Sequence, residues 1–194
     1  YIGIGSNEVV SGDDGEKDYE HIQRIYTQRL EPSTYRNHRE NYAPSANLAT
    51  VIEHINAGAS TIAYCGHGVS TYFVTTGLSN DDVVALTNKK KLPFIVAAAC
   101  KTGAFHSTST DCFGETWLRK ENGGAIIAWM SSVNQPWNPP QRGQDYFYDI
   151  LTGGFNYDLY EDQNGINTSE QRTHWGSLAV NSLALMLAES GGSG

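Results

Sequence analysis

Short apolar runs alternate with amphipathic segments along this 194-residue chain. Continuous apolar runs between turn residues are typical of strands buried on both faces, whereas apolar positions that recur every three to four residues predict helices. The runs that predict buried strands cover residues 1–6, 60–68, 92–100 and 125–130. The segments with helical periodicity cover residues 18–30, 46–57, 83–87, 112–120, 140–150 and 176–189. This alternation predicts an α/β fold with a mostly parallel sheet and helices on both of its faces.

Small polar residues and glycines mark the expected helix ends. Ser45 is the N-cap that we expect for the helix over 46–57, and Gly58 closes that helix. Ser79 and the acids after it are expected to cap the short helix over 83–87. Residues 153–173 are polar and predict a loop.

Two of the strand-like runs end in a reactive side chain. The run over 60–68 closes with His67 between two glycines, and the run over 92–100 ends at Cys100. Because the carboxyl ends of parallel strands meet at one edge of a sheet, both side chains are expected at that edge, where ligands bind. A thiol beside an imidazole is the minimum arrangement for nucleophilic acyl transfer. The alternative is two ordinary core residues, since an isolated Cys or His in such a run is more often structural.

The residues that flank this pair favour the catalytic interpretation. Gly66 and Gly68 lack a Cβ, which lets a substrate backbone approach closely. The amides of Gly68 and Cys100 are expected to point at an oxyanion. The small side chains of residues 97–99 leave room for a pocket beside Cys100.

Two acidic residues are candidates for the same edge. Glu8 ends the first strand-like run, where a carboxylate can orient an imidazole, and a solvated loop acid is the alternative. Asp18 follows an acidic turn and opens a helix, so it can interact with the helix dipole, bind calcium or recognise a cationic side chain. The spacing of the turn does not match an EF-hand loop, which disfavours calcium.

Composition excludes several classes of protein. The formal net charge of −8 disfavours nucleic acid as a partner, because phosphate binding needs clustered Lys and Arg. The 3 cysteines are odd in number and match no zinc spacing, and no metal site is indicated. No run is long enough to span a bilayer. Gly3-Ile4-Gly5 lacks the third glycine of a dinucleotide fingerprint, so a nucleotide-binding domain is a distant alternative.

Several motifs, in order, resemble the gingipain family of cysteine peptidases, which belongs to the same clan as caspases and legumains. They are Cys65-Gly66-His67-Gly68, the run over 92–100, Cys112-Phe113-Gly114-Glu115 and the segment 133–145. The spacings between Glu8, His67 and Cys100 also fit the arginine-type members. The resemblance covers most of the chain and implies a caspase-like three-layer sandwich. It implies that residues 1–189 are a catalytic subdomain trimmed from a larger protein, and residues 190–194 look like a flexible tail or linker.

The resemblance implies a role for each candidate residue. Cys100 becomes the nucleophile, His67 the acid/base, and Glu8 the acid that orients the imidazole. The backbone amides of Gly68 and Cys100 form the oxyanion hole. An acid at the start of the helix binds the substrate guanidinium in arginine-type members, and Asp18 matches that position. The other residues implied in substrate binding are Trp137, Gln135, Ala98, Cys65, Gly66 and Gln141.

The implied activity is an endopeptidase that cleaves protein or peptide substrates after a basic residue, Arg in first place, through a thioacyl-enzyme. The acidic turn is shorter than in the family, so Glu16 or Asp14 is an alternative to Asp18. The pocket residues that depart from the usual types are Cys65 for a threonine, Ala98 for a bulkier residue and Gln141 for a methionine. These departures imply a looser specificity or a shift toward Lys.

The resemblance also bears on cofactors and location. It implies no required cofactor, although a calcium ion in a structural role is compatible with the family. It implies secretion or a place on the bacterial cell surface. A catalytically silent member that binds peptides or partner domains is the main alternative, since the family's flanking domains are expected to be missing from this chain.

Overall fold

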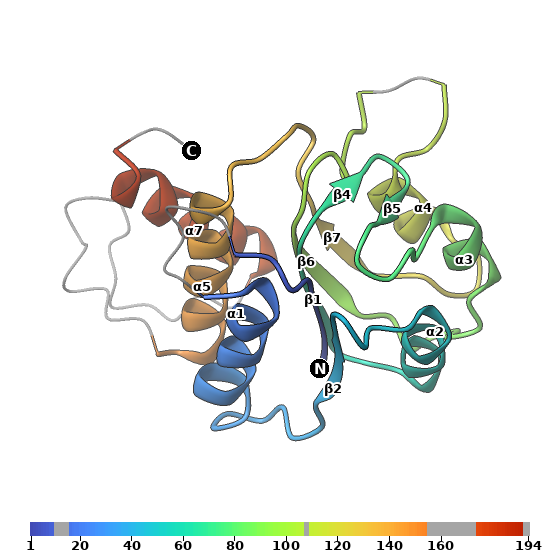
Figure 1. Cartoon of the computed structure of the whole chain (residues 1–194), viewed down its shortest axis with the longest axis horizontal. Helices are drawn as coiled ribbons and strands as arrows, with labels where there is room; N and C mark the ends of the chain where they lie inside the picture. Colours follow the sequence, from blue (N-terminus) through green and yellow to red (C-terminus); the bar gives the residue numbers. More distant parts are fainter. Residues whose placement is uncertain (10–15, 107–108, 155–173, 192–194) are drawn as a thin grey trace.

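The computed structural model describes residues 1–9, 16–106, 109–154 and 174–191 (Figure 1). The central strands are β1 (Ile2–Gly5), β2 (Arg39–Tyr42), β3 (Thr61–Cys65), β6 (Phe94–Ala98) and β7 (Ile127–Trp129). They form a 5-stranded sheet in the order β2-β1-β3-β6-β7. All neighbouring strands of this sheet are parallel. The predicted parallel sheet is confirmed.

Helices cover both faces of the sheet, also as predicted (Figure 1). One face carries α1 (Asp18–Ile25), its π-helical continuation η1 (Tyr26–Leu30), α5 (Asn138–Thr152) and α7 (Trp175–Glu189). The other face carries α2 (Leu48–Ala57), α3 (Asn80–Ala85) and α4 (Phe113–Arg119). A hairpin of β4 (Gly68–Val69) and β5 (Tyr72–Phe73) follows β3. Within the described ranges, no helix has the length and apolar character to cross a membrane.

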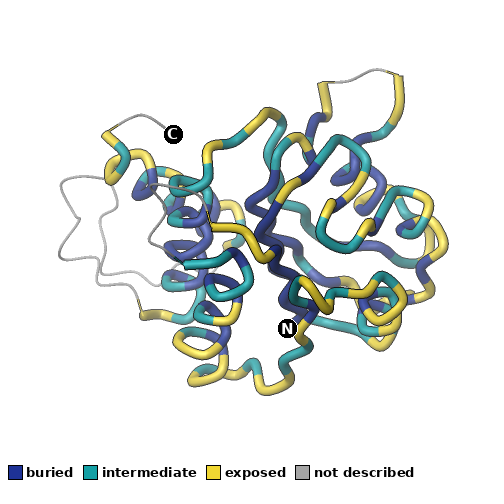
Figure 2. The backbone as a smooth tube through the Cα atoms, in the orientation of Figure 1, coloured by how far each residue is buried: buried dark blue, intermediate teal, exposed yellow. Residues whose placement is uncertain are grey.

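Alternate residues of each central strand pack on opposite sides of the sheet. In β3, Ala63 and Cys65 belong to the core cluster under α1, α5 and α7. Ile62 and Tyr64 belong to the cluster under α2, α3 and α4. Figure 2 shows β1, β3 and β6 as the dark blue, buried centre of the molecule. Burial on both faces explains why β3 appears in the sequence as one continuous apolar run.

The edge strand β2 is a difference from the prediction. Its residues, Arg39–Tyr42, are polar except for the last, and only Asn41 among them is buried. β2 pairs with β1 alone because it lies at the edge of the sheet. An edge strand exposed on one side needs no apolar run, so hydrophobicity does not mark it.

The start of α2 also differs from the prediction. Ser45 was expected to cap this helix, but the helix begins at Leu48 and Asn47 is its N-cap. The Asn47 side-chain oxygen accepts a hydrogen bond from the Thr50 amide at 3.2 Å. Asn and Ser are equally good caps, so the sequence alone does not choose between them. The predicted loop over 153–173 lies almost entirely outside the described residues.

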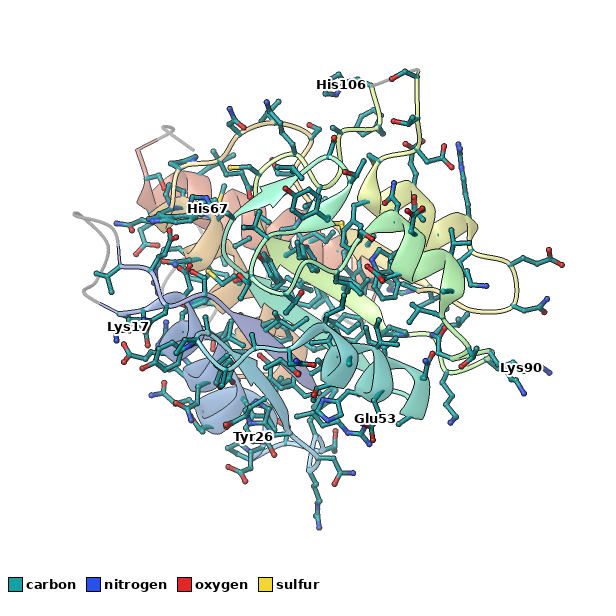
Figure 3. The ribbon with its side chains drawn as sticks, turned by 45° about the vertical axis from the view of Figure 1, so that its right-hand side comes forward. Lys17, Tyr26, Glu53, His67, Lys90 and His106 are labelled. Atoms are coloured by element: carbon teal, nitrogen blue, oxygen red, sulfur yellow. The ribbon has the colours of Figure 1, made fainter. Side chains whose placement is uncertain are left out.

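The strands end together at one edge of the sheet, because they are parallel. Glu8, His67 and Cys100 follow β1, β3 and β6, respectively, at this edge. In Figure 3, His67 lies at the end of the molecule opposite to Tyr26 and Glu53. The topology therefore brings these three candidate residues to the same end of the fold.

Candidate active site

Cys100 lies just beyond the end of β6 and is held by the loop after β7. The Gln135 backbone amide lies 3.4 Å from Cys100 Sγ, and the thiol points at the Gln135 carbonyl oxygen at 3.8 Å. The Gln135 side-chain oxygen accepts a hydrogen bond from the Ala99 amide at 3.1 Å. The thiol is half-buried. Gln135 thus positions both the thiol and the backbone that precedes it.

The chain reverses directly after Cys100. Lys101 has a φ of 57°, in the left-handed region that residues with a side chain rarely adopt. This conformation costs roughly 1 kcal/mol and needs support from its surroundings. The Lys101 amide donates to the Val133 carbonyl at 3.0 Å, and the Gly103 amide donates to the Ser131 carbonyl at 2.8 Å. These bonds stabilise the turn that presents the thiol, a feature that the sequence did not predict.

His67 contacts two other candidate residues. Its Nε2 lies 2.9 Å from Glu8 Oε2, and the two side chains are 54% and 48% exposed. The Trp137 indole lies against the imidazole, with ring centroids 5.0 Å apart and an angle of 39° between the planes. A carboxylate and an aromatic ring therefore both restrict the orientation of the imidazole.

Gly68 packs directly against the backbone of Cys100. A Cβ on Gly68 would lie 2.8 Å from the Cys100 carbonyl oxygen and 2.9 Å from Ala99 Cβ, so only glycine permits this approach. Gly68 faces Phe73 in the β4–β5 hairpin, and the hydrogen bond beside this pair runs from the Val74 amide to the His67 carbonyl at 3.1 Å. Gly68 and Phe73 are therefore a non-hydrogen-bonded pair, in which the Gly68 amide points away from β5.

A narrow pocket adjoins Cys100. It is too narrow to admit a water molecule. Five of the residues that resemblance implies in substrate binding line it together, namely Cys65, Ala98, Gln135, Trp137 and Gln141. Segments far apart in the sequence, from β3 to the start of α5, thus build this pocket.

Gly66 is required by the turn after β3 and does not line the pocket. It has a φ of 151°, and a Cβ at this position would lie 2.9 Å from Thr75 Oγ1 and 3.0 Å from the Tyr64 hydroxyl oxygen. The space beside Gly66 is therefore filled by other parts of the protein. The missing side chain at Gly66 serves the internal packing and leaves no opening for a substrate there.

Asp18 lies behind the walls of the pocket and is completely buried. Its Oδ1 accepts hydrogen bonds from Gln141 Nε2 at 3.1 Å and from the Cys65 thiol at 3.4 Å. Its Oδ2 accepts one from the Ser6 hydroxyl. Burial raises the pKa of Asp18, and the hydrogen bonds from Ser6 and Cys65 oppose that rise. These three donors, from Ser6, Cys65 and Gln141, are all neutral.

Glu16, an alternative acid for the pocket, lies elsewhere. Its carboxylate pairs with Arg24, with 2.9 Å between Oε1 and Nε. Both residues line a second cavity of about 460 Å³, which we call the polar cavity. Glu16 is absent from the lining of the pocket beside Cys100 in the described part of the chain. Asp14, the other alternative, lies outside the described residues.

A buried glutamine on α5 was missed by the sequence analysis. Gln144 Nε2 donates to the carbonyl oxygens of Tyr64 at 2.9 Å and Val96 at 3.0 Å. Its Oε1 lies 3.0 Å from Nε2 of His21. Gln144 therefore links α5 to α1 and to both strands that end at the candidate site.

The next residue on α5, Asp145, is held by cations. Burial alone would raise the pKa of Asp145, but the charges of His21, Arg24 and Arg142 lower it overall. Arg24 Nη1 lies 2.9 Å from Asp145 Oδ1, and Arg142 Nη1 lies 3.0 Å from Asp145 Oδ2. This network attaches α5, and with it one wall of the pocket, to α1.

No metal site is formed by the part of the chain that the structure describes. Within it, no group of three or more His, Cys, Asp or Glu side chains is arranged to hold an ion. Cys65, Cys100 and Cys112 form no disulfide.

Comparison with known proteins identifies similar chains. A model of the family described as peptidase family C25 matches residues 5–184. Gingipain R2 of Porphyromonas gingivalis is 36% identical over 147 residues, which cover 73% of this chain and 19% of that protein. Lys-gingipain of the same organism is 32% identical over 107 residues, which cover 55% of this chain and 6% of that protein. The chain thus spans a fifth or less of the length of these curated relatives.

Solved structures share the fold. The crystal structure of the Arg-specific cysteine proteinase gingipain R matches with a TM-score of 0.84 and 29% identity, over 97% of this chain and 41% of that one. The complex of the pro- and mature domains of RgpB from Porphyromonas gingivalis matches with a TM-score of 0.83 and 28% identity, over 99% and 43% of the two chains. The expected caspase-like sandwich is confirmed.

Proposed function

Because the chain belongs to peptidase family C25, a family of cysteine peptidases, we propose that it is an endopeptidase that cleaves after a basic residue, Arg above all. The substrate is a protein or peptide that carries this residue before the scissile bond. The observation that supports the proposal most is the arrangement around Cys100. His67 pairs with Glu8 at 2.9 Å, and Gly68 packs against the Cys100 backbone.

In the proposed reaction, Cys100 Sγ attacks the carbonyl carbon of the scissile bond while His67 takes the thiol proton. Glu8 accepts a hydrogen bond from the Nε2–H group of His67. Nδ1 is then the basic nitrogen of the neutral ring and receives the proton of Cys100. Protonation makes an imidazolium, which the Glu8 carboxylate stabilises. The nucleophile and the acid/base therefore have distinct partners, Gln135 and Glu8, that keep each in place.

The carbon–nitrogen bond of the substrate then breaks as His67 returns the proton to the leaving amine. The acyl group stays on Cys100 as a thioester. A water molecule attacks this thioester after giving a proton to His67, and the proton returns to the sulfur as the acid product leaves. His67 therefore carries every proton transfer in the cycle.

The oxyanion formed in each step is assigned to the amides of Gly68 and Cys100. The register of the β4–β5 hairpin supports this assignment, because it leaves the Gly68 amide outside the hairpin ladder. Each well-placed amide donor in such a hole is worth roughly 3 kcal/mol of transition-state stabilisation.

Specificity for a basic residue is assigned to Asp18, which lies behind the pocket wall formed by Cys65 and Gln141. A planar guanidinium offers paired donors to a carboxylate, which favours Arg over Lys at a buried site. Trp137 forms one wall of the pocket and also contacts His67. Secretion or cell-surface location, and a structural calcium ion, remain predictions from resemblance.

A panel of fluorogenic peptides that differ only at the residue before the scissile bond tests the proposal. We expect turnover for Arg, slower turnover for Lys, and none for Asp or Leu. Cys100→Ala should lower kcat by about 10⁴-fold or more, since the members of such a site act as a unit. Cys112→Ser, which removes another thiol but keeps an N-cap for α4, is the control and should retain activity.

Two outcomes would contradict the proposal in different ways. Equal turnover of the Arg, Asp and Leu peptides would contradict the basic specificity. Binding of the Arg peptide without any turnover would favour a catalytically silent, peptide-binding member of the same fold.

A further inference from the structure

The carboxylate assigned to substrate recognition is already occupied in this structure. Gln141 Nε2 donates to Asp18 Oδ1 at 3.1 Å and lies 3.3 Å from Cys65 Sγ. Gln141 and Asp18 are both buried. The adjoining pocket has no room even for a water molecule. A substrate guanidinium can reach Asp18 only after the Gln141 amide has moved.

The structure provides a place for the displaced amide. Gln141 lines the pocket beside Cys100 and also lines the polar cavity, so its side chain separates the two. The polar cavity holds about 460 Å³ and contains the carboxylates of Glu16 and Glu189, which can accept hydrogen bonds from an amide. Glu16 already accepts hydrogen bonds from Arg24, and Glu189 accepts them from Arg142 and Tyr146. Because a carboxylate can accept several hydrogen bonds, rotation of the Gln141 side chain exchanges one carboxylate acceptor for another.

Charge favours the exchange when an arginine side chain enters. Asp18 accepts hydrogen bonds from the hydroxyl of Ser6, the thiol of Cys65 and the amide of Gln141, and none of these donors carries a charge. A hydrogen bond between ionised partners is about twice as strong as one between neutral groups. A guanidinium can thus replace the Gln141 amide, whereas a neutral side chain has no such advantage.

The geometry points to a gate made by the Gln141 side chain, which closes on Asp18 in the empty pocket and opens into the polar cavity when a guanidinium binds. This inference rests on the proposed role of Asp18 as the specificity acid. Opening the gate costs the same free energy for every ligand, which weakens the binding of each. Only ligands that interact strongly with Asp18 therefore occupy the pocket. Gln141 is therefore a specificity-determining residue that acts by competition.

Binding of n-butylguanidine to Cys100→Ala protein, measured by calorimetry, tests the gate without the need for catalysis. Gln141→Met keeps the volume of the side chain but removes its donors, and Gln141→Asn keeps the amide but shortens its reach to Asp18. We expect both variants to bind n-butylguanidine about tenfold more tightly than the protein with Gln141. The reason is that the hydrogen bond from Gln141 to the Asp18 carboxylate no longer competes with the ligand. Gln23→Met removes an exposed amide on α1 and is the matched control, with unchanged affinity.

The outcomes separate the gate from the proposed function. Unchanged or weaker binding in both Gln141 variants, while the unmodified chain hydrolyses Arg peptides, would overturn the gate alone. Tighter binding in a chain that lacks Cys100-dependent hydrolysis would support the gate and contradict the peptidase. Absence of n-butylguanidine binding in every variant would contradict Asp18 as the recognition group, and with it the gate.

Discussion

Glu8 Oε2 lies 2.9 Å from Nε2 of His67, and both side chains are about half exposed. In a neutral imidazole, a carboxylate at this distance favours the ring proton on Nε2 and so selects one tautomer. An exposed pair of this kind adds little to the stability of the fold. Its consequence is therefore expected in catalysis rather than in folding.

Removing the Glu8 carboxylate should lower activity without weakening the fold. Glu8→Gln is expected to reduce kcat by about 10- to 100-fold, less than for a buried triad acid, because water partly replaces an exposed carboxylate. The free energy of unfolding should change by less than about 1 kcal/mol. Steady-state kinetics and urea unfolding of the same variant measure the two effects. A large loss of stability with full activity in the folded fraction would contradict the assigned role.

A side chain at Gly68 should disrupt the site. In Gly68→Ala, the Cβ would lie 2.8 Å from the Cys100 carbonyl oxygen, so the hairpin or the Cys100 backbone must shift. We expect kcat/KM to fall by about 100-fold, since a displacement of a fraction of an ångström misplaces both amide donors. Overpacking should also cost about 1 to 3 kcal/mol of stability.

A matched glycine provides the control for that variant. Gly176 lies at the start of α7, and a Cβ built there meets no other part of the described residues within 4 Å, apart from the backbone of its own helix and its chain neighbours. Gly176→Ala should leave kcat/KM unchanged and should not destabilise the helix. Equal activity of the Gly68 and Gly176 variants would contradict the close approach of Gly68 to Cys100.

The amide of Gln144 should matter for stability. It donates to the carbonyl oxygens of Tyr64 and Val96, and both acceptors lie in the buried sheet. Gln144→Leu leaves both carbonyls without this donor and should cost about 2 to 4 kcal/mol. Urea unfolding should show this loss, whereas Gln23→Leu, at an exposed position of α1, should lie within about 0.5 kcal/mol of the unmodified chain.

The stability of the chain should depend on His38 at mildly acidic pH. Burial, with a smaller contribution from the charged amino terminus, lowers the pKa of His38 to about 4. A histidine with a lowered pKa contributes stability that is complete above its unfolded pKa of about 6.5. That contribution is lost as the pH falls toward 4 and amounts to about 3 kcal/mol. Glu40, 3.4 Å from His38 and half exposed, opposes this loss only weakly.

Unfolding measured in urea at pH 7 and at pH 4.5 tests this dependence. His38→Gln keeps a hydrogen-bonding side chain beside the Tyr42 hydroxyl but removes the titration. The variant should lose about 2 kcal/mol less than the unmodified chain between the two pH values. His106→Gln, at an exposed position, is the control. If the free energy of unfolding falls by the same amount between pH 7 and pH 4.5 in the His38 and His106 variants, other groups cause the pH dependence.

The sequence predicts the centre of the sheet because burial on both faces leaves a strong pattern there. β3 and β6 lie between two layers of helices, so nearly every position must be apolar. β2 lies at the edge, where polar residues are tolerated, and periodicity does not reveal it. The places of Cys100, His67 and Glu8 at one edge follow from parallel topology alone.

The pocket could not be predicted to the same extent. The choice between Asp18 and Glu16 depends on tertiary partners, since Arg24 pairs with Glu16 while Gln141 and Ser6 hold Asp18. Local sequence patterns carry no information on such pairings. The polar face of α5 does leave one signal in the sequence. Gln141, Gln144 and Asp145 are spaced three and four residues apart and so share one face of a helix.

Covalent labelling by an arginyl chloromethyl ketone, read by peptide mass spectrometry, tests the central claim most directly. The Cys100 sulfur should displace chloride and form a thioether, at least about tenfold faster than with the aspartyl analogue. Cys65 and Cys112 are buried, and burial raises the pKa of Cys112, so neither should react at a comparable rate. A single adduct at Cys100 that forms with the arginyl reagent is the predicted result. An adduct at Cys65 or Cys112 instead, or equal rates with the arginyl and aspartyl reagents, would contradict the account.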